Sequence, residues 1–311
     1  MEFFKKQTNF PFMATRKVWY TLSAILMIGS VVSFATRGLN LGIDFTGGIS
    51  AAATFSQAAN VDAVRAKLIA AGFKDPQVQS FGSSRDVAIR LPPDPTQNAT
   101  AIRAKLESVL HSVDPSAQVQ QLEIVGPQVG NELKTSATWA LAFTLLLIGI
   151  YIAFRFHTWR LSLGAILAVI HDPILVLGIF SITQTPFDLA VVAAILAVIG
   201  YSLNDTVVVF DRIRERLETN RRLPPDVVLD QSINQTLSRT IMTKVVTSIV
   251  VVALLFLGGP VLRGFSEALM IGIIAGTYSS IYISSAIALD CGLTAEHVFP
   301  SEKKAALDHL P

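Results

Sequence analysis

Six long apolar stretches constrain the fold of this chain more than any other feature of its sequence. Each has roughly the 17–25 residues that an α-helix needs to cross the hydrocarbon core of a bilayer. Of the 311 residues, 51% are hydrophobic and 15% are charged, whereas soluble domains carry about 25% charged residues. We therefore predict an α-helical membrane protein with six transmembrane helices, at residues 18–36, 137–156, 161–182, 186–210, 238–258 and 265–289.

The first stretch, residues 18–36, also has features of a cleaved signal peptide. Basic residues precede it, and Ser33, Phe34 and Ala35 weakly resemble a cleavage site. Its apolar run is longer than the roughly 7–15 residues of a signal-peptide core. We therefore interpret it as a membrane anchor.

Lysine and arginine are distributed unevenly among the segments that connect the spans. The two loops at residues 183–186 and 258–264 contain only Arg263, whereas the other connections are strongly basic. Basic loops of membrane proteins lie on the cytoplasmic side. We therefore expect a membrane protein with cytoplasmic termini, at residues 1–17 and 290–311, and a cytoplasmic loop at residues 211–237. The basic residues are Lys5, Lys6, Arg16, Lys17, Arg155, Arg160, Arg212, Arg214, Arg216, Arg221 and Arg222.

The insert between the first two spans, residues 37–136, has the pattern of a small α+β domain on the outer side of the membrane. Gly72 ends its first helix, and Gly82, Ser83 and Ser84 indicate a hairpin between its second and third strands. The predicted order β-α-β-β-α-β is that of the ferredoxin-like fold. The expected strands are residues 49–55, 78–81, 87–91 and 117–125, and the expected helices are residues 61–71 and 96–113.

The sequence LGIDFTGG, at residues 41–48, leads from the first span into the first strand. Gly42, Gly47 and Gly48 permit a tight turn of the backbone, and Asp44 is the one charged residue of the motif. By themselves these residues predict a turn and no chemistry.

Asn204 and Asp205 are adjacent inside the fourth predicted span, where a charge is costly. An ionised side chain at the bilayer centre costs roughly 2.5–3.5 kcal/mol on insertion scales. Asp205 could have a structural role, as a partner of a neighbouring helix or of Arg212. Alternatively, it binds and releases protons, because burial favours the neutral form of an unpaired carboxyl group. Both interpretations stay open, and Asn204 adds a second hydrogen-bonding side chain.

His171, Asp172 and Pro173 form a polar group halfway along the third predicted span. Because proline lacks an amide hydrogen, we expect the helix to kink at Pro173. Histidine is the side chain whose charge changes closest to neutral pH. The group therefore either satisfies its own hydrogen bonds around a kink or relays protons.

Arg239 and Lys244 lie near the start of the fifth predicted span. Both could extend to the membrane surface as interfacial anchors, and for Lys244 we favour this interpretation. Arg239 could instead pair with a carboxylate of a neighbouring helix and change partner as protons bind.

Gly272 and Gly276 in the sixth span form a G-x-x-x-G pattern, which predicts close packing against another helix. The insert contains no phosphate-binding loop, no metal-ligand spacing and no nucleophile–base arrangement. We therefore expect no enzymatic activity, no cofactor, no bound metal and no nucleic-acid partner.

Five motifs in matching order resemble the SecF family, the smaller subunits of the bacterial SecD–SecF accessory complex of the Sec translocase. They are LGIDFTGG at 41–48, VGPQVGNEL at 125–133, HDP at 171–173, GYSLNDTVVVFDRIRE at 200–215 and NQTLSRT at 234–240. The resemblance covers nearly the whole chain.

The resemblance implies half of an RND-type transporter in the bacterial inner membrane, with the insert, residues 37–136, as a periplasmic domain. The implied partners are SecD, the SecYEG channel complex, an exported polypeptide and the lipid bilayer. It implies that the proton gradient drives export, and it assigns the proton pathway to Asp205 and Arg239. Asp211 is a competing carboxylate in the same motif, but it lies at the cytoplasmic edge. Two alternatives stay open: a purely structural subunit of a membrane complex, and a small-molecule/proton antiporter, for which the insert looks too small.

Overall fold

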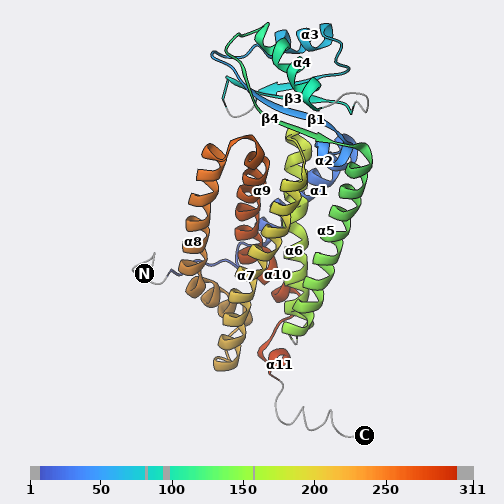
Figure 1. The fold of residues 1–311 in the computed structure, drawn as a ribbon. Coiled ribbons are helices and arrows are strands. Elements are labelled where there is room, and N and C mark those ends of the chain that lie inside the picture. The colour runs from blue at the N-terminus through green and yellow to red at the C-terminus, as the bar shows by residue number, and fades with distance from the viewer. Residues whose placement is uncertain (1–7, 81–82, 94–98, 157, 300–311) are drawn as a thin grey trace.

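Six long helices form the larger part of the molecule (Figure 1). The structure is a computed structural model, and it describes residues 8–80, 83–93, 99–156 and 158–299. Each of the six is long and apolar enough to cross a membrane, which confirms the predicted fold class. The spans are α1 (Arg16–Arg37), α5 (Pro127–Arg155), α6 (Trp159–Thr183), α7 (Leu189–Thr219), α8 (Pro225–Leu257), and a sixth made of α9 (Gly259–Tyr278), the π-helical turn η1 (Ser279–Ile283) and α10 (Ser284–Asp290).

Three of the helices extend beyond the apolar stretches that predicted them. α5 begins at Pro127, α7 continues to Thr219 and α8 begins at Pro225. The segment that we expected to be a loop, residues 211–237, is therefore largely helical. Hydrogen bonds between side chains join the extensions of α7 and α8 to each other. These two helices therefore continue beyond their apolar segments.

The spans divide into a central and a peripheral set. In the most apolar part of α6, α7 and the sixth span, 61%, 56% and 61% of the residues are buried, against 17%, 11% and 17% in α1, α5 and α8. A helix that is buried on most sides belongs to the centre of a bundle, and one buried on a single side lies at its edge. Polar groups on α6, α7 and the sixth span are therefore the best shielded from lipid and water.

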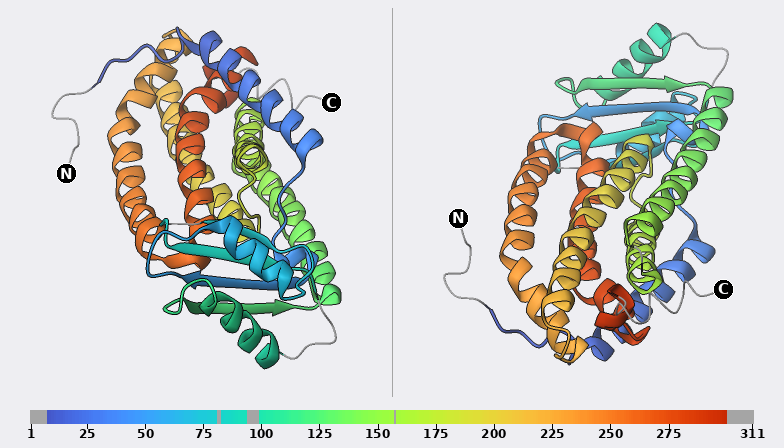
Figure 2. Two further views of the ribbon diagram at one scale, coloured as in Figure 1. Left: turned by 90° about the horizontal axis from the view of Figure 1, so that it is seen from above. Right: turned by 90° about the horizontal axis from the view of Figure 1, so that it is seen from below.

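The insert between α1 and α5 is a four-stranded antiparallel sheet with two helices over one face (Figures 1 and 2). The element order is β-α-β-β-α-β and the strand order is β2-β3-β1-β4, so the ferredoxin-like prediction is confirmed. Alternate residues of each strand point into a core beneath the helices, as Val87, Ile89 and Leu91 do in β3. The elements are β1 (Gly48–Thr54), α3 (Val61–Ala70), β2 (Gln77–Ser80), β3 (Asp86–Leu91), α4 (Ala99–His111) and β4 (Gln118–Val125), preceded by the short helix α2 (Ile43–Thr46).

The uncovered face of the sheet points towards one end of the helix bundle (Figure 1). At the opposite end, Nε of Arg16 lies 3.0 Å from Oδ1 of Asp290, so the start of α1 and the end of α10 meet. A short helix, α11 (Ala295–Val298), follows at the same end. Several positions named above lie outside the described residues: Lys5, Lys6, Phe81, Gly82, residues 96–98 and residues 300–311.

Candidate functional site

The fourth and fifth spans are joined inside the bundle by an ion pair. Oδ2 of Asp205 on α7 lies 2.6 Å from Nζ of Lys244 on α8, and the two side chains are only 6% and 7% exposed. The Lys244 ammonium group also lies 4.1 Å from the centre of the Tyr201 ring, a cation–π contact. Each charge is neutralised by the other, which offsets the cost of removing both from water.

The interpretation of Lys244 as an interfacial anchor is therefore wrong. A lysine stem extends to the membrane surface when water offers the best environment for its charge. Here Asp205 provides an opposite charge within the bundle, and Lys244 points towards it instead. Arg239 lies exposed on α8, and no ion pair within the described part of the chain involves it. Asn204 is likewise exposed, on a different face of α7 from Asp205.

Asp211 is separate from the buried ion pair. One of its carboxylate oxygens lies 2.5 Å from Nη2 of Arg155 on α5, and the two side chains are 41% and 34% exposed. An ion pair of this exposure is partly screened by water and stabilises little. Asp211 is accordingly the more accessible of the two acids on α7.

A second buried acid lies at the centre of the bundle. Asp172 on α6 is fully buried, and its Oδ2 accepts hydrogen bonds from Oγ of Ser202 on α7 and, at 3.0 Å, from Oγ of Ser279 on η1. Its Oδ1 lies 3.0 Å from Nδ1 of the neighbouring His171. No lysine or arginine within the described residues forms an ion pair with this carboxylate. The group therefore depends on hydroxyls and an imidazole for its stabilisation.

Two irregular features accompany Asp172. The ring atom Nε2 of His171 is buried and has no hydrogen-bond partner within the described residues, so this imidazole keeps one free site for a proton or a water molecule. The sixth span changes from α- to π-helix at Ser279, the residue that donates to Asp172. Single π-helical turns occur frequently at functional sites. The α-helix α6, in contrast, continues through Pro173 without ending.

Helix α7 contacts both acids. Ser202 and Asp205 are three residues apart and therefore share a face, so a rotation or shift of α7 changes both environments. The sixth span comes so close to α7 that a Cβ atom on Gly272 would lie 2.1 Å from Cγ2 of Val198. A Cβ atom on Gly276 would lie 3.0 Å from Cβ of Ser202 and 3.2 Å from Oδ2 of Asp172.

The end of α7 nearest the sheet is hydrogen bonded to the LGIDFTGG segment. The amide of Phe187 donates to the carbonyl of Asn40 at 2.8 Å, and the amide of Gly42 donates to the carbonyl of Phe187 at 2.7 Å. The amide of Leu189 then donates to Oδ2 of Asp44 at 2.9 Å. The segment before β1 is thereby attached to the helix that carries Asp205.

Two glycines of this segment are required by the backbone, and a third is tightly packed. A Cβ atom on Gly42 would lie 3.1 Å from Cβ of Asp188. Gly47 and Gly48 have φ angles of +71° and +133°, and Cβ atoms there would lie 2.8 Å from Cα of Pro127 and 2.6 Å from the carbonyl oxygen of Leu91. The motif therefore forms a compact joint between α7, α5 and the sheet.

Two family models match the chain in these regions. One, described as "SecD/SecF GG Motif", matches residues 32–59, and the other, described as "Protein export membrane protein SecD/SecF, C-terminal", matches residues 105–294. The chain belongs to the SecD/SecF family. A relative from Haemophilus influenzae named "Protein translocase subunit SecF" is 48% identical over 300 residues, which cover 96% of this chain and 91% of the relative. The protein of the same name from Vibrio alginolyticus is 42% identical over 311 residues, which cover 99% and 98%.

A solved structure has the same arrangement. The crystal structure of SecDF, a translocon-associated membrane protein from Thermus thermophilus, matches with a TM-score of 0.82 and 38% identity. The match covers 94% of this chain but only 39% of the SecDF chain. This member of the SecD/SecF family is thus a multi-pass inner-membrane protein that spans about two fifths of the SecDF chain.

Within this SecD/SecF chain, sequence reasoning located Asp205 and Asp172 but missed their main partners. The sequence favoured the membrane surface for Lys244, and it did not indicate Ser202 and Ser279 as hydrogen-bond donors to Asp172. One signal was available: the fifth apolar stretch contains a lysine and the fourth an aspartate, which are the natural partners of each other in a nonpolar environment.

Proposed function

We propose that this chain is an accessory subunit of the bacterial Sec protein translocase which, together with SecD, uses the proton motive force to promote polypeptide export. The buried ion pair between Asp205 on α7 and Lys244 on α8 carries this proposal. An acid and its counter-ion on two different transmembrane helices form a group whose protonation changes the attraction between those helices. The relatives from Haemophilus influenzae and Vibrio alginolyticus are named as protein translocase subunits. Polypeptide export is therefore the process that such a change in attraction would drive.

Proton binding at Asp205 is the central step of the proposed mechanism. While the carboxyl group is ionised, it attracts Lys244 and holds α7 against α8; a proton on the carboxyl group removes that attraction. One charge that crosses the full membrane field gains roughly 2.3 kcal/mol per 100 mV, enough to change a two-state equilibrium by more than tenfold. Because α7 also reaches the segment before β1, its displacement is transmitted to the sheet.

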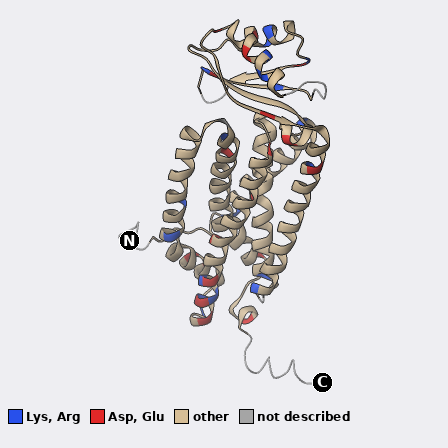
Figure 3. Cartoon of the chain, in the orientation of Figure 1, with Lys and Arg blue, Asp and Glu red and all other residues tan. Residues whose placement is uncertain are grey.

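The proposed orientation places the α/β domain in the periplasm and both chain termini in the cytoplasm. Figure 3 shows lysine and arginine positions at the end of the bundle opposite the sheet, and basic segments stay on the cytoplasmic side. The proton motive force drives protons from the periplasm to the cytoplasm, so in this orientation protons enter from the side on which the α/β domain contacts exported chains.

SecD is the proposed partner within the membrane. The chain corresponds to 39% of SecDF, so a working unit needs a further membrane part. Asn204 and Arg239 are exposed on α7 and α8, and polar groups that face lipid are costly. A partner that covers them removes that cost. SecYEG and the exported polypeptide complete the proposed assembly, and the proton is the coupling ion with no cofactor.

The test uses Asp205→Asn in proteoliposomes that contain this chain, SecD and the translocon. We expect gradient-driven proton uptake and the gradient-dependent part of export to fall by roughly tenfold or more, because an amide cannot exchange a proton. SecD should still co-purify with the variant. The matched control is Asp211→Asn on the same helix, which should retain both activities because its carboxylate is half-exposed.

Unchanged proton uptake in Asp205→Asn would rule out this acid as the coupling group. Loss of SecD from the purified variant would instead indicate that Asp205 has a structural role in assembly.

A further inference from the structure

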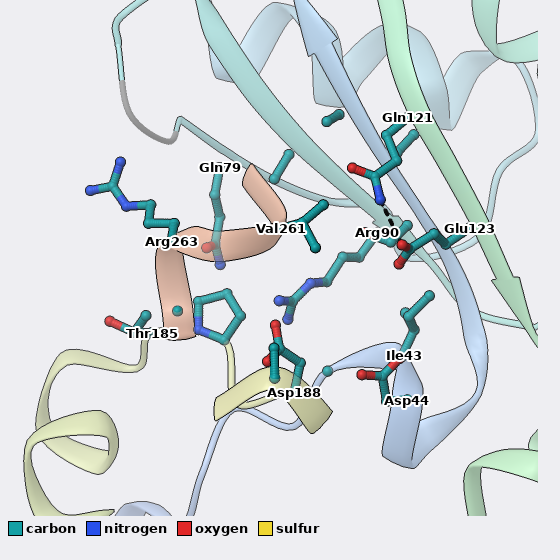
Figure 4. A pocket seen from close by; sticks show the side chains of 18 of the residues that line it. Ile43, Asp44, Gln79, Arg90, Gln121, Glu123, Thr185, Asp188, Val261 and Arg263 are labelled. Carbon is teal, nitrogen blue, oxygen red and sulfur yellow. Dashed lines mark hydrogen bonds between the residues drawn. The ribbon is translucent and has the colours of Figure 1, made fainter. Parts of the chain in front are cut away.

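A polar cavity separates the sheet from the outer end of the helix bundle (Figure 4). Its volume is about 390 Å³, and its walls carry Gln79, Arg90 and Gln121 from the sheet and Asp188 and Arg263 from the bundle. The apolar core of the α/β domain and that of the bundle are separate clusters. The face of the sheet over this cavity is therefore not held to the bundle by a shared apolar core.

Arg90 is the side chain that extends from the sheet across this cavity. In β3 it lies opposite Ser50 of β1 and Gln77 of β2, on the face that points away from the core of the α/β domain. Its guanidinium group points into the space beside Asp188 and Asp44 (Figure 4). Its Nη1 donates to Oδ1 of Asn40 at 3.4 Å. Arg90 therefore faces the polar residues around the outer end of α7.

Both acids next to Arg90 hold the first turn of α7. Asp188 is the N-cap residue, and its Oδ1 accepts from the amide of Val191 at 2.9 Å. Asp44 accepts from the amide of Leu189 at 2.9 Å. Each carboxylate thus uses one oxygen for the helix and directs its negative charge towards the cavity.

The electrostatics connect the three groups. Burial raises the pKa of Asp188, and the nearby charge of Asp44 raises it further, whereas the Val191 amide and the positive charge of Arg90 lower it. Burial lowers the pKa of Arg90, and the charges of Asp188 and Asp44 raise it. The cation therefore compensates the Asp188 carboxylate, which burial would otherwise disfavour, and the charges of Asp188 and Asp44 in turn favour the cation.

We propose that Arg90 is a positioning residue that couples the displacement of α7 to the orientation of the α/β domain. This proposal rests on the proposed proton-driven function, and it identifies how a displacement of α7 within the membrane is transmitted to the α/β domain outside it. The LGIDFTGG segment attaches α7 to the entry of β1, through Gly47 and Gly48, and β4 leads through Gly126 directly into α5. Both attachments lie at the end of the sheet where Gly48 pairs with Val125, so the sheet can rotate about that end. Arg90 on β3 adds the hydrogen bond to Asn40 and the attraction to Asp44 and Asp188 at the end of α7, which oppose that rotation.

The length and continuity of α7 support this role. It is one uninterrupted helix of 31 residues, and Asp205 lies about 24 Å along it from Leu189 at 1.5 Å per residue. A rigid helix carries a shift at Asp205 to its outer end with little loss. The cavity beneath the sheet leaves it room to follow that shift.

The test measures proton uptake and export separately in proteoliposomes that contain the full chain, SecD and the translocon. In Arg90→Gln we expect the amount of polypeptide exported per proton taken up to fall roughly five- to tenfold, with proton uptake within about twofold of the unmodified protein. Arg90→Lys should restore most of the ratio, because the charge remains. Asp188→Asn should lower the ratio as Arg90→Gln does, because asparagine keeps the helix cap but not the charge.

The matched control is Arg103→Gln. Arg103 lies on α4, and its Nε pairs with Glu107 of the same helix at 2.9 Å, so the ratio should stay unchanged. An unchanged ratio in Arg90→Gln would overturn the proposal, as would a parallel loss of proton uptake and export. Failure of the proposed function appears differently, as proton uptake that persists in Asp205→Asn.

Spin labels on the sheet and on the outer end of α8 give a second measurement that does not depend on transport. The distance distribution between them should broaden in Arg90→Gln and stay narrow in Arg103→Gln. A narrow distribution in both variants would show that Arg90 does not fix the orientation of the sheet.

Discussion

Two buried acids of the helix bundle, Asp205 and Asp172, are stabilised in opposite ways. Asp205 meets the full positive charge of Lys244 from a neighbouring helix. Asp172 is held by the hydroxyls of Ser202 and Ser279 and by the adjacent imidazole. Both lie against α7 and are shielded from solvent, so their surroundings differ in charge rather than in burial.

This difference determines how strongly protonation of each acid affects the packing of the helices. If Asp205 gains a proton, the charge attraction to Lys244 is lost, and the interaction between α7 and α8 becomes weaker. Hydroxyl groups both donate and accept hydrogen bonds, so the partners of Asp172 can satisfy a charged or a neutral carboxyl group by rotating. A protonation change at Asp172 therefore alters the packing of its helices less than one at Asp205 does.

The largest effect on stability should come from Lys244→Met. The variant leaves the Asp205 carboxylate buried without a counter-charge, which costs about 3–5 kcal/mol when one partner of a buried pair is removed. The double variant Asp205→Asn/Lys244→Met should recover most of this loss, because no charge is left unpaired. Thermal unfolding of the purified protein in detergent measures both, and a double variant no more stable than Lys244→Met would contradict the ion pair.

A smaller loss of stability is expected at Asp172, the acid that has no lysine or arginine partner within the described residues. Asp172→Leu removes the acceptor of the Ser202 hydroxyl, and one unsatisfied buried group costs about 1–3 kcal/mol. The Ser279 hydroxyl keeps the carbonyl of Gly276 as a second acceptor. Asp172→Asn should be milder, because the amide oxygen still accepts from Ser202 or Ser279. The control is Asp62→Asn, whose side chain is 88% exposed on α3. Equal unfolding temperatures for the leucine and asparagine variants would show that the hydroxyls do not depend on Asp172.

The smallest effect should follow from Gly276→Ala. Its new Cβ would lie 3.0 Å from Cβ of Ser202 and 3.2 Å from Oδ2 of Asp172, so the helices must separate by a few tenths of an ångström, at about 1 kcal/mol. Gly200→Ala on α7 is the matched control, since nothing lies within 4 Å of its Cβ position. Thermal unfolding should show a loss only for Gly276→Ala; equal values would place Asp172 in a more adaptable site.

The sequence allowed prediction of the spans and of the β-α-β-β-α-β order because both depend on periodicity and on the length of apolar runs. It did not determine which basic residue of the fifth span meets Asp205. Arg239 and Lys244 are five residues apart, and at 3.6 residues per turn they project about 140° from each other. Only one can face α7, and the part of α8 after Lys244 is predominantly apolar on every side, so the sequence pattern of this part does not indicate which side of the helix faces α7.

The role of Arg90 had no sequence signal either. An arginine that alternates with Ile89 and Leu91 in a strand indicates a solvent-facing side chain. Its position opposite Asp188 depends on how the sheet is placed over the bundle, through contacts between residues nearly a hundred positions apart in the chain. Local patterns contain no information about such a contact.

The meeting of Arg16 and Asp290 has a consequence for gene architecture. An even number of membrane crossings brings both ends of the bundle to one side, so a polypeptide fused ahead of α1 or behind α10 begins on that same side without an additional crossing. In the Thermus thermophilus SecDF chain, the part that matches this protein makes up 39% of one longer polypeptide. A fusion or a separation of the two genes can therefore occur without a change in the membrane orientation of any helix.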